Sequence, residues 1–185
     1  MSSTAYPNDR RDRYLTPRLE TARLSLRWLT PDDTGLMLAI WNDPAFVRFV
    51  GDRGIRTHED AQEAMKNGAL SLYEDYGYGP FRIALKESDT AIGISGLFRR
   101  EGLDIPDLGY STLPEFCGKG YAYEAATAVM HHAREDLGLG DLIAIISPEN
   151  EASIGLIGKL GFEFERMHAM PGDKSAVQLY CKRLN

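Results

Sequence analysis

Two glycines that flank a lysine, directly before an alanine-rich segment, have the clearest chemical potential in this chain. The order is Gly118-Lys119-Gly120, and Tyr121 and Ala122 then open an expected helix. Glycine has no side chain to keep a ligand off the backbone, and a helix start presents unpaired N–H groups at the positive end of its dipole. Phosphate groups bind in such settings. We therefore expect a phosphate ester held by backbone amides without a metal, although a turn between glycines is also common in ordinary loops.

Two better-known phosphate motifs do not fit these residues. A P-loop needs a serine or threonine after the lysine, where this chain has Gly120. A dinucleotide-binding fingerprint needs a third glycine where this chain has Tyr123, in a βαβ unit that begins at the first strand. The glycine loop instead lies past the middle of the chain, after several expected strands.

A second pattern follows downstream, where an apolar strand is expected over residues 142–146, Asn150 stands in a polar turn, and a short helix is expected over 151–160. Together with the glycine loop, this pattern resembles the GNAT superfamily of N-acetyltransferases, and within it the RimJ/RimL-type branch of ribosomal-protein N-terminal acetyltransferases. The resemblance covers residues 18–185. Segments that fit the branch in order are residues 19–27, 41–44 and 91–97.

The order of expected elements, mixed strands first and then β-α-β-α-β-β, is typical of an α/β domain around one mostly antiparallel sheet. The resemblance implies the GNAT fold in a single domain, with a mixed sheet of about seven strands, splayed between the fourth and fifth and flanked by about four helices. It also implies an N-acetyltransferase that passes the acetyl group of acetyl-CoA, its co-substrate, to a primary amine by direct attack in a ternary complex. A protein N-terminus, a polyamine, an amino acid and a drug amine are the open acceptors. A CoA-binding domain without turnover, serving as a sensor or interaction module, is the alternative.

The resemblance also implies candidate site residues. Asp107 and Tyr110, on a strand expected over residues 107–113, are the catalytic candidates. Asn150 and Ser153 would hydrogen-bond the pantetheine arm, with helix capping as the alternative. The full set of candidates for binding acetyl-CoA is Ser111, Leu113, Phe116, Cys117, Gly118, Lys119, Gly120, Tyr121, Ala122, Asn150 and Ser153.

The chain departs from the family pattern at Glu115, the first position of the glycine-loop signature, and at Ile157, where many members carry a tyrosine as general acid. The attacking amine must lose a proton, because lysine-type amines have a pKa near ~10 and α-amines near ~8. Asp107 is the candidate base, with Glu115 as its rival and an exposed strand-edge charge as the alternative for Asp107. The leaving thiol has a pKa of about 8.5 and departs as a thiolate, so Ile157 need not abolish activity.

The chain of 185 residues is long enough for one domain with a substantial core. Lys and Arg total 21 against 27 Asp and Glu, and the net charge of −6 disfavours nucleic acid as a partner and slightly favours cationic substrates. Cys117 and Cys181 are too few for a disulfide framework or a zinc site. No apolar run suits a membrane span and the polar start is no signal peptide, so we expect a cytoplasmic monomer or homodimer.

Residues 1–17, with the basic cluster Arg10, Arg11 and Arg13, are expected to form a flexible arm before the acetyltransferase domain at 18–185. Residues 19–29 alternate as one half-buried strand. Further expectations are a helix from Thr30 that Pro44 bounds, one from Thr57 toward Tyr73, a hairpin of strands 81–86 and 91–98, a long helix over 119–137, and two closing strands.

The early helices carry a group of acids beside aromatic residues. In this family the acceptor cleft is built there, so we expect the acids to attract a cationic primary amine and the aromatic residues to flank it. A solvated helix face is the alternative for the acids. The acids are Asp43, Asp52, Glu59, Asp60 and Glu63, and the aromatic residues are Trp41, Phe46 and Phe49.

Overall fold

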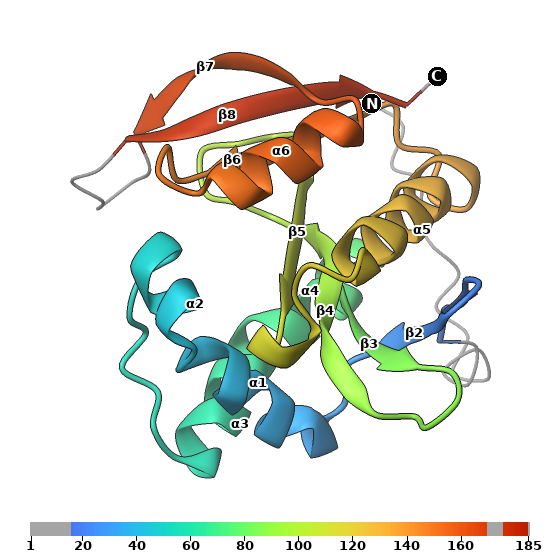
Figure 1. Ribbon diagram of the computed structural model, residues 1–185, viewed down its shortest axis with the longest axis vertical. Helices are drawn as coiled ribbons and strands as arrows, with labels where there is room; N and C mark the ends of the chain where they lie inside the picture. The colour runs from blue at the N-terminus through green and yellow to red at the C-terminus, as the bar shows by residue number, and fades with distance from the viewer. Residues whose placement is uncertain (1–15, 170–175, 185) are drawn as a thin grey trace.

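The computed structural model describes residues 16–169 and 176–184. Within them the chain forms one α/β domain around an eight-stranded sheet with the order β1-β2-β3-β4-β5-β6-β8-β7 (Figure 1). Every neighbouring pair is antiparallel except β5 and β6, which are parallel. The strands are β1 (Arg18–Glu20), β2 (Leu24–Trp28), β3 (Pro80–Leu85), β4 (Ala91–Phe98), β5 (Asp107–Thr112), β6 (Asp141–Ile146), β7 (Glu163–Ala169) and β8 (Ala176–Arg183).

The helices divide between two ends of the chain, four before β3 and two after β5. They are α1 (Thr34–Trp41), α2 (Pro44–Phe49), α3 (His58–Asn67), α4 (Ala69–Tyr76), α5 (Tyr121–Glu135) and α6 (Glu151–Lys159), with 3-10 turns at Pro31–Asp33 and Pro114–Phe116. Within the described ranges, no helix has the length and apolar character needed to cross a membrane.

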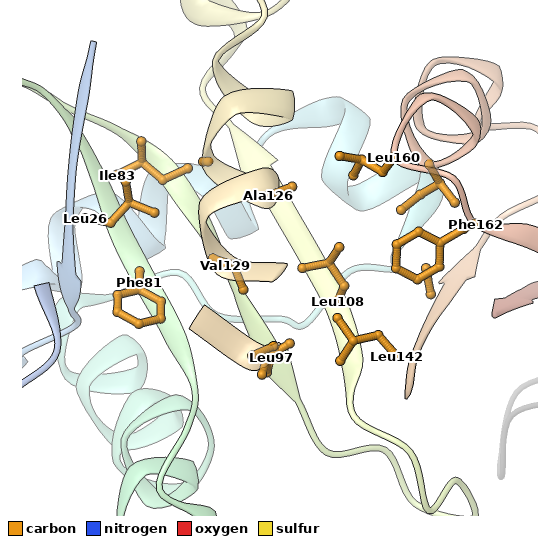
Figure 2. Packing of buried hydrophobic residues seen from close by; sticks show 14 of the residues in the cluster. Leu26, Phe81, Ile83, Leu97, Leu108, Ala126, Val129, Leu142, Leu160 and Phe162 are labelled. Carbon is orange, nitrogen blue, oxygen red and sulfur yellow. The ribbon is translucent and has the colours of Figure 1, made fainter. Parts of the chain in front are cut away.

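Two main apolar cores lie on opposite sides of the sheet. The larger joins α5 to the strands, and Figure 2 shows Ala126 and Val129 of this helix facing Leu97 and Leu108 of β4 and β5. The small side chains Ala125, Ala126, Val129 and Ala133, all fully buried, let α5 lie close to the sheet. The second core joins α1 and α3 to the opposite face of β4 through Ile94.

Most expected elements after residue 57 are confirmed. Strands β3 and β4 form the expected antiparallel hairpin, the long helix is α5, and β7 and β8 close the sheet. The expected splay is also present, because the parallel pair β5 and β6 shares a single register pair, Asp107 with Ile143. The fold predicted from the sequence is therefore confirmed.

The single strand expected over residues 19–29 is wrong, because the chain reverses there. The N–H of Thr21 donates to the Leu24 carbonyl (3.0 Å), and its hydroxyl oxygen accepts from the Leu24 N–H (2.9 Å). This turn divides the segment into β1 and β2, which pair antiparallel. The sheet has eight strands, one more than expected, for this reason.

The expected helix count also changes at two positions. Thr57 caps α3 as expected, since its hydroxyl accepts from the Asp60 N–H (3.1 Å), but Gly68 leaves the helical region (φ −125°, ψ −92°) and α4 starts anew. Pro44, expected to bound the first helix, opens α2 instead, at a position where proline's missing N–H removes no intrahelical bond. Six α-helices result among the described residues in place of about four. The expected flexible arm lies outside the described residues apart from residues 16 and 17.

Candidate active site

The parting of β5 and β6 is built around the side chain of Asp107. The Ile143 N–H donates to the Pro106 carbonyl (3.0 Å) beside the single register pair of the two strands, Asp107 with Ile143. The next amide that points the same way, that of Ile145, donates to the Asp107 carboxylate (3.3 Å). A side chain therefore stands where the strand ladder would continue, and beyond it no further register pair joins the two strands within the described residues.

Asp107 itself is a buried ion-pair partner, with 1% of its surface exposed. Its second oxygen accepts from Arg100 Nε (2.7 Å). Burial raises the pKa of this carboxyl, while Arg100 and the Ile145 amide oppose the shift. The alternative of an exposed strand-edge charge is thereby removed.

The glycine loop leads from the 3-10 turn at Pro114–Phe116 into α5. Gly118 and Gly120 have φ angles of +74° and +78°, a left-handed backbone that favours glycine, and a Cβ atom at Gly118 would meet no atom within 4 Å. The first helical bond of α5 runs from the Glu124 N–H to the Gly120 carbonyl, and no described side chain caps this end. The amides of Tyr121 to Tyr123 therefore have the free donors of an open helix start, the kind of donor that binds phosphate groups.

A group of hydrogen bonds that was not expected from the sequence joins this loop to the β1–β2 turn. Glu124 accepts hydrogen bonds from the Thr21 hydroxyl (2.6 Å), the Arg23 N–H (2.8 Å) and Arg23 Nε (2.6 Å). Burial disfavours the charge, but these bonds hold the pKa of Glu124 below its usual value. The Arg23 guanidinium also donates to the Lys119 carbonyl (3.0 Å) and lies over the Tyr121 ring (4.5 Å to its centroid).

The start of α6 faces the parted strands. The Asn150 side-chain oxygen accepts from the Ser153 N–H (3.1 Å), so Asn150 caps this helix. The Tyr110 hydroxyl donates to the Ser153 carbonyl (3.2 Å), and burial raises the pKa of this phenol to about 12. Ile157, at the position of the family's tyrosine, is fully buried in the larger core.

A cavity of about 400 Å³ lies beside the parted strands, within the size range of small-molecule sites. Asp107, Tyr110 and Ser111 line it from β5, and Asn150 and Ser153 line it from α6. The opposite wall comes from the two first helices and the loop that follows them, through Trp41, Phe46, Phe49 and Arg53.

The remaining candidates for CoA binding lie along the glycine loop and outside the cavity lining. Cys117 is exposed, and its thiol lies near the Thr112 hydroxyl (3.3 Å). The Lys119 ammonium lies over the Phe116 ring (5.6 Å to its centroid). These candidates, which lie between the end of β5 and the first turn of α5, are Leu113, Phe116, Cys117, Gly118, Lys119, Gly120, Tyr121 and Ala122.

The expected acidic lining of the acceptor cleft is wrong. None of the five acids named above lines the cavity, whose charged lining residues are Arg53, Arg99, Arg100 and Asp107. Two of the acids interact locally instead. Asp43 caps α2 by accepting hydrogen bonds from the Ala45 and Phe46 amides, and Asp52 forms an ion pair with Arg56 (2.7 Å).

The parted parallel pair, the open helix start behind a glycine loop and the adjoining cavity are features of acyltransferases that use CoA thioesters. Residues 23–163 match the family described as the acetyltransferase (GNAT) domain. The chain therefore belongs to the GNAT family, whose members use acetyl-CoA, and it is an N-acetyltransferase.

Similar proteins support the family and differ in what their names say they acetylate. YoaA of Bacillus subtilis, an uncharacterized N-acetyltransferase, is 30% identical over 151 residues, which cover 80% of this chain and 84% of YoaA. RimL, a ribosomal L7/L12 α-N-protein acetyltransferase solved with coenzyme A, has a TM-score of 0.77 at 16% identity, covering 90% of this chain and 98% of its own. Spermidine N-acetyltransferase from Vibrio cholerae, solved with CoA and spermine, has a TM-score of 0.73 at 16% identity, covering 89% and 97%. The shared fold thus accommodates different amines.

Proposed function

We propose that this N-acetyltransferase transfers the acetyl group of acetyl-CoA directly to the primary amine of an acceptor held in the cavity between β5, α6 and α1–α2. The observation that carries the proposal is the parting of β5 and β6 at Asp107, which leaves unpaired backbone edges between the cavity and the glycine loop. Backbone donors fixed in position at such an edge are suited to polarising a thioester carbonyl. Acetyl-CoA supplies the activated acetyl group.

The glycine loop and the start of α5 are the proposed site for the CoA phosphates. The amides of Gly118 to Ala122 would bind the pyrophosphate, and the left-handed glycines keep side chains out of its path. Ser111 of β5, together with Asn150 and Ser153 of α6, lines the cavity between the loop and Asp107, where the pantetheine arm would lie. The binding of CoA by this chain would then depend on backbone more than on charge.

Asp107 is the proposed group that takes the proton of the attacking amine. Its burial raises its pKa, and a carboxyl with a raised pKa is a better base near neutral pH. Both carboxylate oxygens already accept hydrogen bonds from the protein. The proton would therefore reach Asp107 either when the amine replaces the Arg100 or the Ile145 hydrogen bond, or through one water. Tyr110, protonated at neutral pH, is the proposed hydrogen-bond donor to the leaving thiolate, a role that Ile157 does not fill. Its hydroxyl would exchange its hydrogen bond with the Ser153 carbonyl for one with the thiolate.

We propose an α-amine, such as a protein or peptide N-terminus, as the acceptor. The aromatic wall of Trp41, Phe46 and Phe49 suits an extended chain with side chains, and the arginine-rich lining disfavours a polycation. RimL, which resembles this chain in fold, is named for such an acceptor.

The test is a thiol-release assay with acetyl-CoA and a panel of amines, with mass spectrometry of the products. Peptides with free N-termini, free amino acids, spermidine and lysine side-chain analogues form the panel. We expect release with α-amines and little with spermidine. If CoA binds and no amine on the panel is acetylated, the transferase proposal is wrong and the binding module becomes the better description.

A further inference from the structure

One arginine of the cavity has no carboxylate partner in the part of the chain that the structure describes. Arg53, in the loop between α2 and α3, lines the cavity, and its guanidinium carbon lies 5.5 Å from the Trp41 ring centroid and 5.7 Å from that of Phe46. No ion pair or hydrogen bond of its guanidinium is found among the described residues, whereas the other two arginines of the lining are paired. Arg99 binds the Asp104 carboxylate (3.0 Å), and Arg100 binds Asp107 (2.7 Å).

The surroundings of Arg53 make an added negative charge favourable. The Arg53 side chain is exposed to solvent, although its guanidinium lines the cavity beside the Trp41 and Phe46 rings. Partial desolvation there, with repulsion from Arg100, lowers the pKa of Arg53. An anion beside Arg53 would offset both the desolvation of the guanidinium and its repulsion from Arg100. This local positive charge contrasts with the net charge of −6 of the whole protein.

The chemistry of arginine narrows the kind of anion. A guanidinium presents a planar fork that binds a carboxylate through two parallel hydrogen bonds, and neighbouring aromatic rings help to hold that plane in place. Trp41 and Phe46 supply such rings for Arg53. Asp107 lines the same cavity from β5. The cavity therefore has a place for a carboxylate at Arg53 and a place for an amine at Asp107.

We propose that Arg53 binds a carboxylate of the acceptor, so that the substrate is a molecule carrying both an amine and a carboxylate. This inference rests on the proposed function and narrows its acceptor. Two sources supply that chemistry: a free amino acid, through its α-carboxylate, and a peptide with an acidic side chain near its N-terminus.

The experiment compares matched acceptors in steady-state kinetics. Each pair has the same amine, with the carboxylate free in one member and amidated in the other; one set consists of amino acids and the other of short peptides beginning with Glu or Gln. We expect the parent protein to prefer the carboxylate member by about 10- to 100-fold in kcat/KM, the range for a hydrogen-bonded charge. The set that shows the preference identifies the source.

Substitutions then connect the preference to Arg53. Arg53→Gln should remove it, mainly through KM, and Arg53→Lys should keep part of it, because a lysine retains the charge and loses the fork. Arg56→Gln is the matched control: Arg56 lies in the same loop, is exposed, and pairs with Asp52 outside the cavity, so its variant should keep the full preference. A preference that survives in Arg53→Gln, or a parent that acetylates both members equally, would overturn the inference while leaving the transferase intact.

A binding measurement covers the case in which no acceptor turns over. N-acetylglycine and its amide serve as product-like probes, titrated by NMR into the protein saturated with CoA. We expect the acid to bind the parent at least about tenfold more tightly than the amide, and this difference to vanish in Arg53→Gln. Equal binding of acid and amide would refute the role of Arg53, whereas a lack of acetyl transfer to every amine would refute the proposed function instead.

Discussion

At the scale of single residues, Asp107 shows how one side chain shapes both the sheet and the site. Its carboxylate receives the Ile145 amide where a strand partner would otherwise do so, and the parallel pair opens there. The same carboxylate is buried against Arg100, which keeps a proton-accepting group at the base of the cavity. The same carboxylate therefore ends the pairing of the two strands and is the proposed proton acceptor.

Asp107→Asn should lower turnover by about a hundredfold or more, because general-base removal has effects of this order, and should change the affinity for acetyl-CoA little. The raised pKa also sets the pH dependence: the rate through Asp107 is low while the carboxyl is protonated and rises as pH increases past that pKa. This limb should be absent from the pH profile of the variant. Asp104→Asn, which changes an exposed acid in the loop before β5, is the control; equal effects of the two variants would rule out a special role for Asp107.

At the scale of elements, the glycine loop and α5 form one unit with the β1–β2 turn. Glu124 on the first turn of α5 binds Thr21 and Arg23, which are about a hundred residues away in sequence. The turn thus holds the helix start in place, and the helix start presents the amides that we assign to phosphate.

Gly120→Val should abolish binding of acetyl-CoA in calorimetry, because the new side chain would crowd the proposed phosphate site, where a Cβ atom at Gly120 already lies 3.4 Å from the Arg23 guanidinium. The substitution also strains a left-handed backbone, so its loss of stability must be separated from its loss of binding. Gly138→Val is the control, since Gly138 has a similar φ of +64° in the loop after α5 with open space around it. We expect both to lose about 1–3 kcal/mol of stability and only Gly120→Val to lose CoA. If Gly120→Val binds as Gly138→Val does, the phosphate assignment is wrong.

Glu124→Gln should destabilise the fold at neutral pH by about 1–2 kcal/mol, reduced from a buried value because Arg23 is half exposed. The folded-state pKa of Glu124 lies below its unfolded value, so its stabilisation is present above the unfolded pKa of about 4.5 and is lost as pH falls through the lower folded value. Denaturant unfolding of the parent and the variant should therefore converge at acidic pH. Glu20 on β1 forms an exposed ion pair with Lys86, so Glu20→Gln should change stability much less. A stability difference between the parent and Glu124→Gln that stays constant with pH would contradict the account.

The sequence predicted the elements whose signals are local and missed those that depend on distant contacts. The hairpin of β3 and β4, the Thr57 cap and the glycine loop follow from residues close together in the chain. The β1–β2 reversal was missed because residues 20–23 contain neither glycine nor proline, and the turn is closed by the threonine Thr21. In the site, Arg53 was missed because the fold alone brings the α2–α3 loop to the cavity, and the acids beside it in sequence pointed to the opposite charge.

At the scale of the whole molecule, the domain places opposite charges in different regions. The protein is acidic overall, while the lining of its cavity has three arginines and one buried aspartate. The cavity lies where the core of α1 and α3 meets the parted strands. The helices α1 and α2 on one side of it and α6 on the other come from different ends of the chain (Figure 1). Such an arrangement suits two substrates that enter separately and meet at the gap.

The most direct test of direct transfer is a grid of initial rates in which acetyl-CoA and an accepted amine are both varied, together with mass spectrometry of the protein after acetyl-CoA alone. The account predicts double-reciprocal lines that intersect, as a ternary complex requires, and a protein whose mass is unchanged without the amine. Parallel lines with an acetylated protein, for instance at the exposed Cys117, would show a covalent intermediate and contradict direct attack.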